Sequence, residues 1–157
     1  MTVLAGFSIS DRSEKKALRE EIEPKDILSE IQGTWVLVME KYGEEGMLRP
    51  PQRGHVKQKL VNGKHFSWVE YTEEGEMVAM GGGTYEITGS AYTETIEYCY
   101  PTESNLLGVS IPFSHSFEDG MWLHKGFLRS RELNGDTGEY EVRETQRISE
   151  VWKKVSK

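Results

Sequence analysis

Short turns, most of them containing glycine, divide the chain into runs of alternating polar and apolar residues. Asn62-Gly63, Glu74-Gly75, Gly89-Ser90 and Asp119-Gly120 are two-residue turns of the kind that joins antiparallel strands. Because such a turn leaves no room for a crossover connection, each strand must pair with the next one along the chain. The turns therefore predict an antiparallel meander.

Alternation with a period of two residues begins after Gly33 and continues almost to the end of the sequence. Eight strands are predicted, at residues 34–42, 55–61, 64–72, 76–88, 91–100, 108–118, 121–129 and 140–155. Closing an eight-stranded meander pairs both edge strands and leaves an interior that either fills with side chains or holds one small ligand. We therefore predict an all-β fold, an eight-stranded antiparallel up-and-down β-barrel with a short N-terminal helical segment.

The first 32 residues are predicted to form a helical extension. Apolar residues at helical spacing predict short helices at 10–23 and 24–31, and Pro24 suits the first position of the second helix. With 157 residues and 36% hydrophobic content, the chain has enough apolar residues for one core. The predicted division is a helical extension at 1–32 and a barrel domain at 33–157.

The charge distribution and the single cysteine restrict the partners of the chain. The net charge is −7 and no basic run exceeds two residues, so binding to nucleic acid is not expected. Cys99 has no second cysteine to pair with, and its strand position predicts an outward side chain. No window approaches the roughly 20 apolar residues of a membrane span, and the N-terminus does not resemble a secretion signal. We expect a cytoplasmic protein without a cofactor; a homodimer is left open.

Two links are longer than the turns, at 43–54 and at 101–107. Loops of this length at one end of a barrel can form the mouth of a cavity, although simple connection is the commoner role. A third stretch, 130–139, is rich in polar turn residues and is expected to form a turn region.

The Gly89-Ser90 turn predicts which residues face each other across its hairpin. The pairs are Tyr85 with Glu94, Ile87 with Tyr92, Gly83 with Ile96 and Gly81 with Tyr98. This face is apolar except for Glu94, and a carboxylate in an aromatic row must be paired, neutralised or used.

The same face continues through the two preceding turns to Phe66, Trp68 and Glu70. Across Asn62-Gly63, the turn sets Trp68 opposite Lys57, Phe66 opposite Lys59 and Glu70 opposite His55. Rings mixed with cations and a carboxylate are typical of a ligand cavity. The run of glycines at 81–83 can also host a bulge that reverses the faces, and then Val69, Tyr71, Val78 and Met80 would point inward instead.

The Asp119-Gly120 turn sets Phe117 opposite Trp122, His115 opposite His124 and Phe113 opposite Gly126. Two facing imidazoles can supply a proton donor and acceptor near neutral pH, alone or with Glu94. The simpler alternative is a pair of hydrogen-bonded histidines on a half-exposed sheet. A metal site would need a third ligand that the sequence does not identify, and none is predicted.

Gly33-Thr34-Trp35, at the opening of the first strand, resembles the Gly-x-Trp motif of the lipocalin or calycin superfamily. Several further motifs resemble bacterial lipocalin-like domain proteins of uncharacterised function: His65-Phe66-Ser67-Trp68, Gly82-Gly83-Thr84-Tyr85, Tyr92-Thr93-Glu94-Thr95-Ile96, Trp122-Leu123-His124-Lys125-Gly126 and Glu150-Val151-Trp152. The resemblance covers about residues 31–155 and implies that Trp35 lies at the closed end of a barrel. The Thr-Asp-Tyr motif and cysteine pair of secreted lipocalins are missing, so their ligands do not carry over.

The favoured function is binding of a small hydrophobic or aromatic molecule inside the barrel. The alternative is a cofactor-independent cyclase or isomerase that folds a hydrophobic biosynthetic intermediate and moves a proton through glutamate and histidine, resembling the allene oxide cyclases. A third reading is haem binding through His115 or His124, as in haem-carrying calycin barrels. The predicted catalytic residues are Glu94, His115 and His124, and the predicted ligand-binding residues are Lys59, Phe66, Trp68, Tyr85, Tyr98, Phe113, Phe117 and Trp122.

Overall fold

A computed structural model describes residues 24–102 and 105–155 of the chain. It divides the chain into two units between Glu30 and Ile31, and the second unit contains all the strands described below. Helix α1 (Pro24–Ile31) forms where helical spacing predicted it. The helix predicted at residues 10–23 lies outside the described residues.

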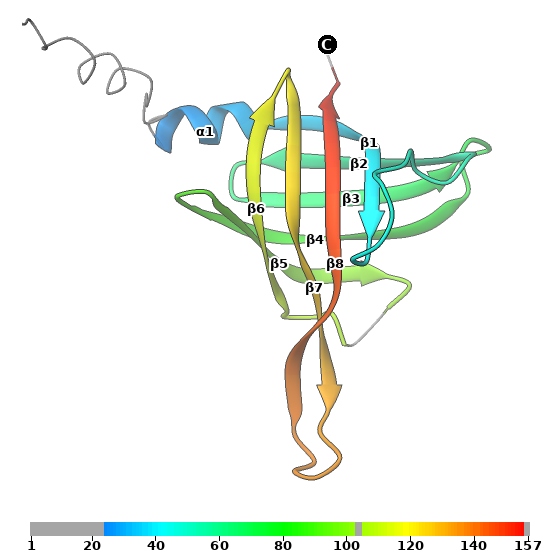
Figure 1. Cartoon of the computed structure of the whole chain (residues 1–157), viewed down its shortest axis with the longest axis vertical. Helices are drawn as coiled ribbons and strands as arrows, with labels where there is room; N and C mark the ends of the chain where they lie inside the picture. Colours follow the sequence, from blue (N-terminus) through cyan, green and yellow to red (C-terminus); the bar gives the residue numbers. More distant parts are fainter. Residues whose placement is uncertain (1–23, 103–104, 156–157) are drawn as a thin grey trace, which may run out of the picture. The chain divides into compact units, whose positions relative to one another are not determined.

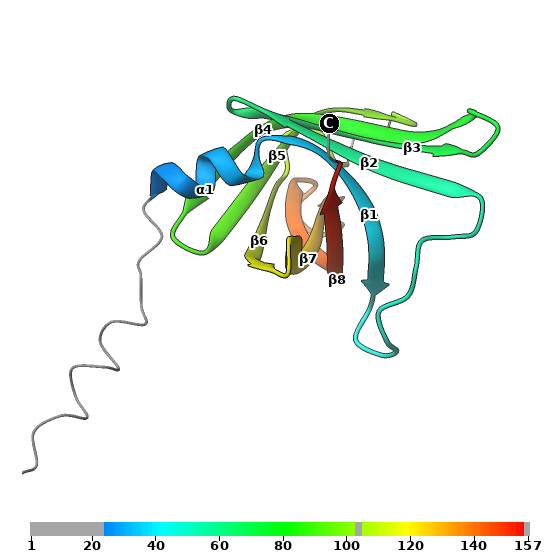
Figure 2. The ribbon, with the colours of Figure 1, turned by 90° about the horizontal axis from the view of Figure 1, so that it is seen from above.

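Eight antiparallel strands follow in sequence order and close into one barrel, as predicted (Figures 1 and 2). Each strand pairs with its neighbours along the chain, and β8 returns to pair with β1. The strands are β1 (Gly33–Tyr42), β2 (His55–Asn62), β3 (His65–Thr72), β4 (Met77–Thr88), β5 (Ala91–Tyr100), β6 (Ser110–Glu118), β7 (Met121–Leu133) and β8 (Tyr140–Lys154).

Backbone conformation explains why the hairpins turn where they do. Asp119 and Gly120 have φ values of 51° and 74°, and a type I′ turn requires positive φ at both central residues. The resulting register sets His115 opposite His124 and Phe117 opposite Trp122, as predicted. At the Gly89-Ser90 turn the predicted pair of Tyr85 and Glu94 is also confirmed.

The register predicted between β2 and β3 was wrong by two residues. The turn is Gly63-Lys64, with Gly63 at a φ of 62°, so Asn62 pairs with His65. Lys59 therefore lies opposite Trp68, and Lys57 lies opposite Glu70. A shift of two residues preserves the alternation, so the predicted faces of both strands are retained.

The predicted bulge is present, but the extra residue lies on β5 and not in the glycine run of β4. Gly83 pairs with Ile96 whereas Gly82 pairs with Tyr98, which leaves Glu97 as the additional residue. Strands β2 and β3 therefore keep the Trp68 face inward, whereas the two faces of β5 exchange after Glu97. Tyr98, predicted to face inward, is 44% exposed, and Cys99, predicted to face outward, lines the interior cavity described below.

Two glycines of the run, Gly81 and Gly83, allow neighbouring groups to approach the backbone of β4 closely. A Cβ atom on Gly81 would lie 3.0 Å from the indole ring of Trp68, and one on Gly83 would collide with the backbone oxygen of Thr95. Trp68 therefore packs against bare backbone.

Aromatic side chains fill the end of the barrel that carries the two-residue turns Gly63-Lys64, Gly89-Ser90 and Asp119-Gly120; the Glu74-Gly75 turn lies at the other end. Trp35 and Trp122 are buried with ring centroids 5.1 Å apart, and Tyr92 packs against the edge of Trp122 at the same separation. The indole nitrogen of Trp35 donates a hydrogen bond of 2.8 Å to the carbonyl of Ile31. This filled end leaves space only toward the opposite end, where the two long loops lie.

Strands β7 and β8 continue beyond the barrel as a long two-stranded hairpin, which Figure 1 shows in orange below the other strands. The prediction ended the seventh strand at residue 129, but β7 runs to Leu133 because Asn134 caps the turn through its side-chain oxygen. Residues 130–133 of the stretch predicted as a polar turn region are therefore strand, and 134–139 form the turn.

Candidate functional site

A cavity of about 520 Å³ lies inside the barrel at the end with the long loops. We call it the main cavity. Its wall presents more apolar than polar surface, and the apolar side chains are Trp68, Ile96, Leu106, Ile111, Phe113, Leu128, Ile148 and Trp152. Charged side chains reach the same space: Lys57, Lys59, Glu70, Glu94, Arg129 and Glu150. Asn105 and Leu106 come from the second long loop, which was predicted as a candidate for the mouth.

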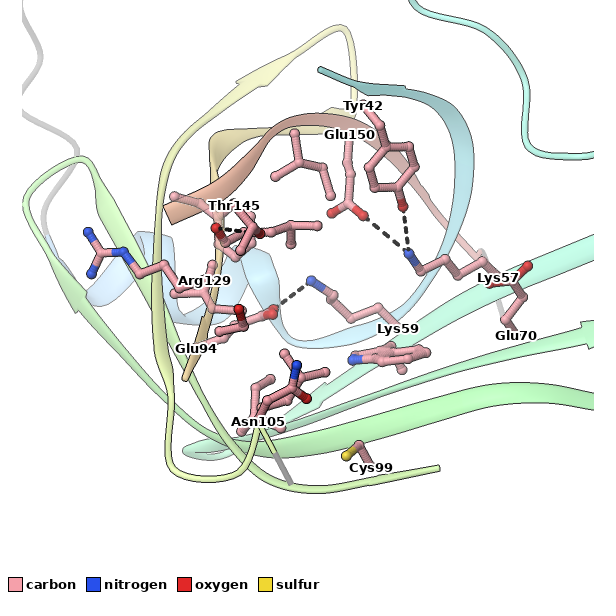
Figure 3. Close-up of a pocket in the computed structure, with 18 of the residues that line it drawn as sticks. Tyr42, Lys57, Lys59, Glu70, Glu94, Cys99, Asn105, Arg129, Thr145 and Glu150 are labelled. Carbon is pink, nitrogen blue, oxygen red and sulfur yellow. Dashed lines mark hydrogen bonds and ion pairs between the residues drawn. The ribbon is translucent and has the colours of Figure 1, made fainter. Parts of the chain in front are cut away.

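Lys59 and Glu94 form an ion pair within this cavity (Figure 3). The Lys59 ammonium lies 2.5 Å from a carboxylate oxygen of Glu94, and the two residues are only 2% and 4% exposed. The two strands that carry them, β2 and β5, are not neighbours in the sheet, so the pair spans the interior. Glu94 thus meets the sequence-based requirement that a carboxylate in an aromatic row be paired.

Aromatic rings surround the Lys59 ammonium. Its nitrogen lies 4.9 Å from the ring centroid of Trp152 and 5.9 Å from that of Phe113, and Phe66, Tyr92 and Trp122 are at similar distances. The faces of aromatic rings are electron-rich and attract cations. Rings and carboxylate together compensate the loss of hydration at this buried charge.

A second charged cluster joins β1, β2 and β8. The ammonium of Lys57 lies 3.4 Å from the hydroxyl of Tyr42 and 3.4 Å from a carboxylate oxygen of Glu150. Burial alone would lower the pKa of Lys57, but the adjacent Glu150 carboxylate, the Tyr42 hydroxyl and Glu40 together outweigh it and raise that pKa above its usual range. Burial likewise opposes ionisation of Glu150, yet Lys57 and other neighbours hold the pKa of Glu150 well below its usual range.

Glu150 also links this cluster to the barrel core. It accepts a hydrogen bond of 3.1 Å from the indole nitrogen of Trp152, and its second contact is His124, whose Nδ1 lies 3.7 Å away. That separation is too long for a hydrogen bond. Both ring nitrogens of His124 have no hydrogen-bond partner among the described residues.

The two histidines do not form the proton relay predicted with Glu94. His124 is completely buried, and burial together with the nearby Lys59 lowers its pKa to about 3, so the ring is neutral at pH 7. Burial also lowers the pKa of His115. Neither histidine lines the main cavity, and the partner of Glu94 is Lys59. The Asp119-Gly120 turn correctly predicts that His115 and His124 lie opposite each other. It contains no information on how far the cavity extends along the barrel.

The predicted ligand-binding residues divide into four groups. Lys59, Trp68 and Phe113 line the main cavity, together with Glu94. Phe66, Tyr85 and Trp122 are buried in the filled end, where the Tyr85 hydroxyl donates a hydrogen bond of 2.6 Å to the carbonyl of Gly63. Phe117 is half-buried and stacks on Trp122, and Tyr98 lies on the outer face because of the bulge at Glu97.

Three residues of the site were missed or given no functional role. Tyr42 and Glu150 were not predicted, and Lys57 was placed on the inward face without a function. The alternation Ile148-x-Glu150-x-Trp152 was the available signal, since all three line the main cavity. This alternation did not lead to a prediction, because the polar stretch between β7 and β8 does not determine the register of β8.

No cluster of three or more histidine, cysteine or acidic side chains within residues 24–102 and 105–155 is arranged to hold a metal ion. In the same part of the chain, the helix is too short and too polar to cross a membrane. Models of known protein families give no match to this chain, and a search of curated proteins gives none either.

Proposed function

We propose that the barrel binds one small hydrophobic or aromatic molecule in its main cavity, as calycin-like barrels do. The observation that carries the proposal is the ion pair of Lys59 and Glu94 facing a cavity of about 520 Å³. This volume is in the usual range for small-molecule sites, which combine apolar walls with a few placed polar groups. Two further observations are consistent with the proposal: the Gly33-Thr34-Trp35 motif resembles the Gly-x-Trp motif of lipocalins, and the eight strands form a closed barrel.

The energetics of the buried charges support a functional reading. Replacing a buried ion pair by well-packed apolar side chains is often neutral or stabilising, so stability alone does not require such a pair. A charged pair that borders a cavity instead offers a donor and an acceptor to a bound molecule.

Filling the cavity tests this proposal. Leu128→Trp introduces a larger side chain into the cavity wall, whereas Leu123→Trp makes the same change at a half-buried residue of β7 outside the cavity. We expect the uncharged aromatic probe N-phenyl-1-naphthylamine to bind the wild-type protein and Leu123→Trp with similar affinity, and to bind Leu128→Trp at least about tenfold more weakly. Equal binding to both variants would place the probe elsewhere and contradict the proposal.

A cofactor-free cyclase or isomerase is the second candidate, and the same ion pair favours it. Glu94 and Lys59 are ionisable groups that reach the cavity, whereas the histidines of the predicted relay do not. Native mass spectrometry of the purified protein would identify a retained molecule, which is then incubated with fresh protein. Recovery of the unchanged molecule favours binding alone. Conversion by the wild-type protein, lost in Glu94→Gln with binding intact, favours proton transfer.

A further inference from the structure

A second cavity adjoins the main cavity. Its volume is about 380 Å³, and its wall presents more polar than apolar surface, the reverse of the main cavity. The first long loop contributes Arg49, Pro50, Pro51 and Gln52 to it. Its remaining wall comes from β1, β2 and β3, so it lies between this loop and the barrel strands.

Three side chains belong to the walls of both cavities: Tyr42, Lys57 and Glu70. Figure 3 shows them together at one side of the main cavity, away from the pair of Lys59 and Glu94. The ammonium of Lys57 makes contacts of 3.4 Å to Tyr42 and Glu150, well beyond the roughly 2.8 Å of a strong charge-assisted hydrogen bond. The Lys57 ammonium is therefore available to donate a stronger hydrogen bond to an oxygen atom of a ligand placed at this boundary.

The charges of the second cavity are balanced. Lys57 and Arg49 contribute positive charge, and Glu40 and Glu70 contribute negative charge. Oε1 of Glu70 lies at hydrogen-bond distance, 2.8 Å, from Nδ1 of the His55 imidazole, whereas the guanidinium of Arg49 has no ion-pair or side-chain hydrogen-bond partner in the described ranges. An anionic group would gain Arg49 and Lys57 but would be repelled by both carboxylates. Mixed donors and acceptors without net charge suit a neutral group with several hydroxyls.

We infer that the ligand has two parts: an apolar body in the main cavity and an uncharged, hydroxyl-bearing head in the second cavity, crossing between them beside Lys57. This inference rests on the proposed function, since it assigns the polar end of the molecule bound in the main cavity. The head is recognised by Arg49 and Gln52 of the loop and by Glu40 and Lys57 of the strands. Each hydrogen bond adds modestly to affinity and strongly to selectivity.

Three probes with the same eight-carbon chain separate the possibilities: 1-octanol, used below its solubility limit, and octanoate and n-octyl-β-glucoside, each used below its micelle concentration. Binding is followed by tryptophan fluorescence, because Trp68 and Trp152 line the main cavity. For the wild-type protein we expect the glucoside to bind about tenfold more tightly than octanol, because its head gains one to two net hydrogen bonds. We expect octanoate to bind no more tightly than octanol.

Arg49→Ala tests the head site, with Arg53→Ala as the matched control in the same loop. Both arginines are exposed, and Arg53 lines neither cavity. Arg49→Ala should reduce the advantage of the glucoside to about threefold or less while leaving octanol binding unchanged, and Arg53→Ala should change neither. Circular dichroism establishes that both variants are folded.

The outcomes distinguish this inference from the proposed function. Octanol binding without a preference for the glucoside, preference for octanoate, or an unaffected preference in Arg49→Ala would overturn the two-part ligand and leave the main-cavity site standing. Failure of all three probes to bind would overturn both.

Discussion

The two ends of the barrel are built from the same strands but differ in what occupies their interior. At the end with two-residue turns, Trp35 and Tyr92 both pack against Trp122, and none of the three lines either cavity. At the end with long loops, the inward positions carry Lys59, Glu94 and other charged side chains around a cavity. Alternation decides which side chains point inward at both ends. Side-chain volume and charge then decide whether the interior is solid or hollow.

The largest expected effect tests the solid end. Trp35→Ala removes a buried indole and its hydrogen bond to Ile31, and should lower the free energy of unfolding by about 3–5 kcal/mol. Trp68→Ala, at a half-buried residue of the cavity wall, should cost less and should weaken ligand retention instead. Urea denaturation measures both variants. A larger loss of stability in Trp68→Ala, with ligand binding intact, would contradict the comparison between the two ends.

The next effect concerns the charges of the hollow end. Lys59→Met leaves the carboxylate of Glu94 buried without its partner, which should lower the free energy of unfolding by about 3 kcal/mol at pH 7. The double variant Lys59→Met/Glu94→Leu removes both charges and should recover to within about 1 kcal/mol of the wild-type protein. A double-mutant cycle from urea denaturation gives the coupling between the two residues. Full stability of the single variant would mean that water screens the pair.

Acid should destabilise the protein through His124 at the boundary between the two ends. Burial lowers the pKa of His124 from 6.5 to about 3, so the unfolded chain binds a proton in this pH range that the folded chain does not. Stability therefore falls as the pH decreases below 6.5, with a limiting slope of about 1.4 kcal/mol per pH unit. The depressed pKa of Glu150 adds a loss of the same sign below pH 4.5.

His124→Gln should reduce the slope between pH 6.5 and 4.5, as measured by urea denaturation at a series of pH values. His65→Gln, at an exposed histidine of β3, is the control and should keep the wild-type slope. An unchanged slope in His124→Gln would show that this imidazole is solvated, and that the filled end is less solid than its packing indicates.

The smallest effect is expected at the rim of the hollow end, where the hairpin of β7 and β8 leaves the barrel. Arg129 and Glu144 form an ion pair of 2.9 Å there, and both side chains are partly exposed. Glu144→Gln should change the free energy of unfolding by less than about 1 kcal/mol, because exposed pairs gain little in water. Thermal unfolding measures this change, and a larger loss would indicate that the hairpin supports the adjacent cavity wall.

The residues of the tight turns made the fold and part of the site predictable. A turn such as Gly89-Ser90 specifies partners residue by residue, and so Tyr85 and Glu94 were correctly paired from sequence. The partner of Glu94 across the interior was not predictable, because Lys59 lies on a strand that is not its neighbour. Turns determine neighbours within the sheet, whereas distances across the interior depend on how the closed barrel is filled.

Register signals were also weak where no tight turn constrained them. The position of Glu150 depends on β8, which follows a long polar hairpin, and its contacts with Lys57 and Trp152 have no counterpart in local sequence. The bulge at Glu97 was similarly ambiguous, because the three glycines allowed an irregularity but did not indicate which strand would carry it.

That bulge separates the length of β5 from the composition of the cavity wall. Deleting Glu97 would restore regular alternation without changing the partners of the flanking residues, because Tyr98 already lies opposite Gly82 and Cys99 opposite Gly81. The phenol of Tyr98 would stay outside and the thiol of Cys99 would stay in the cavity wall. The barrel can therefore gain or lose one amino acid at this point without exchanging the side chains that line the cavity.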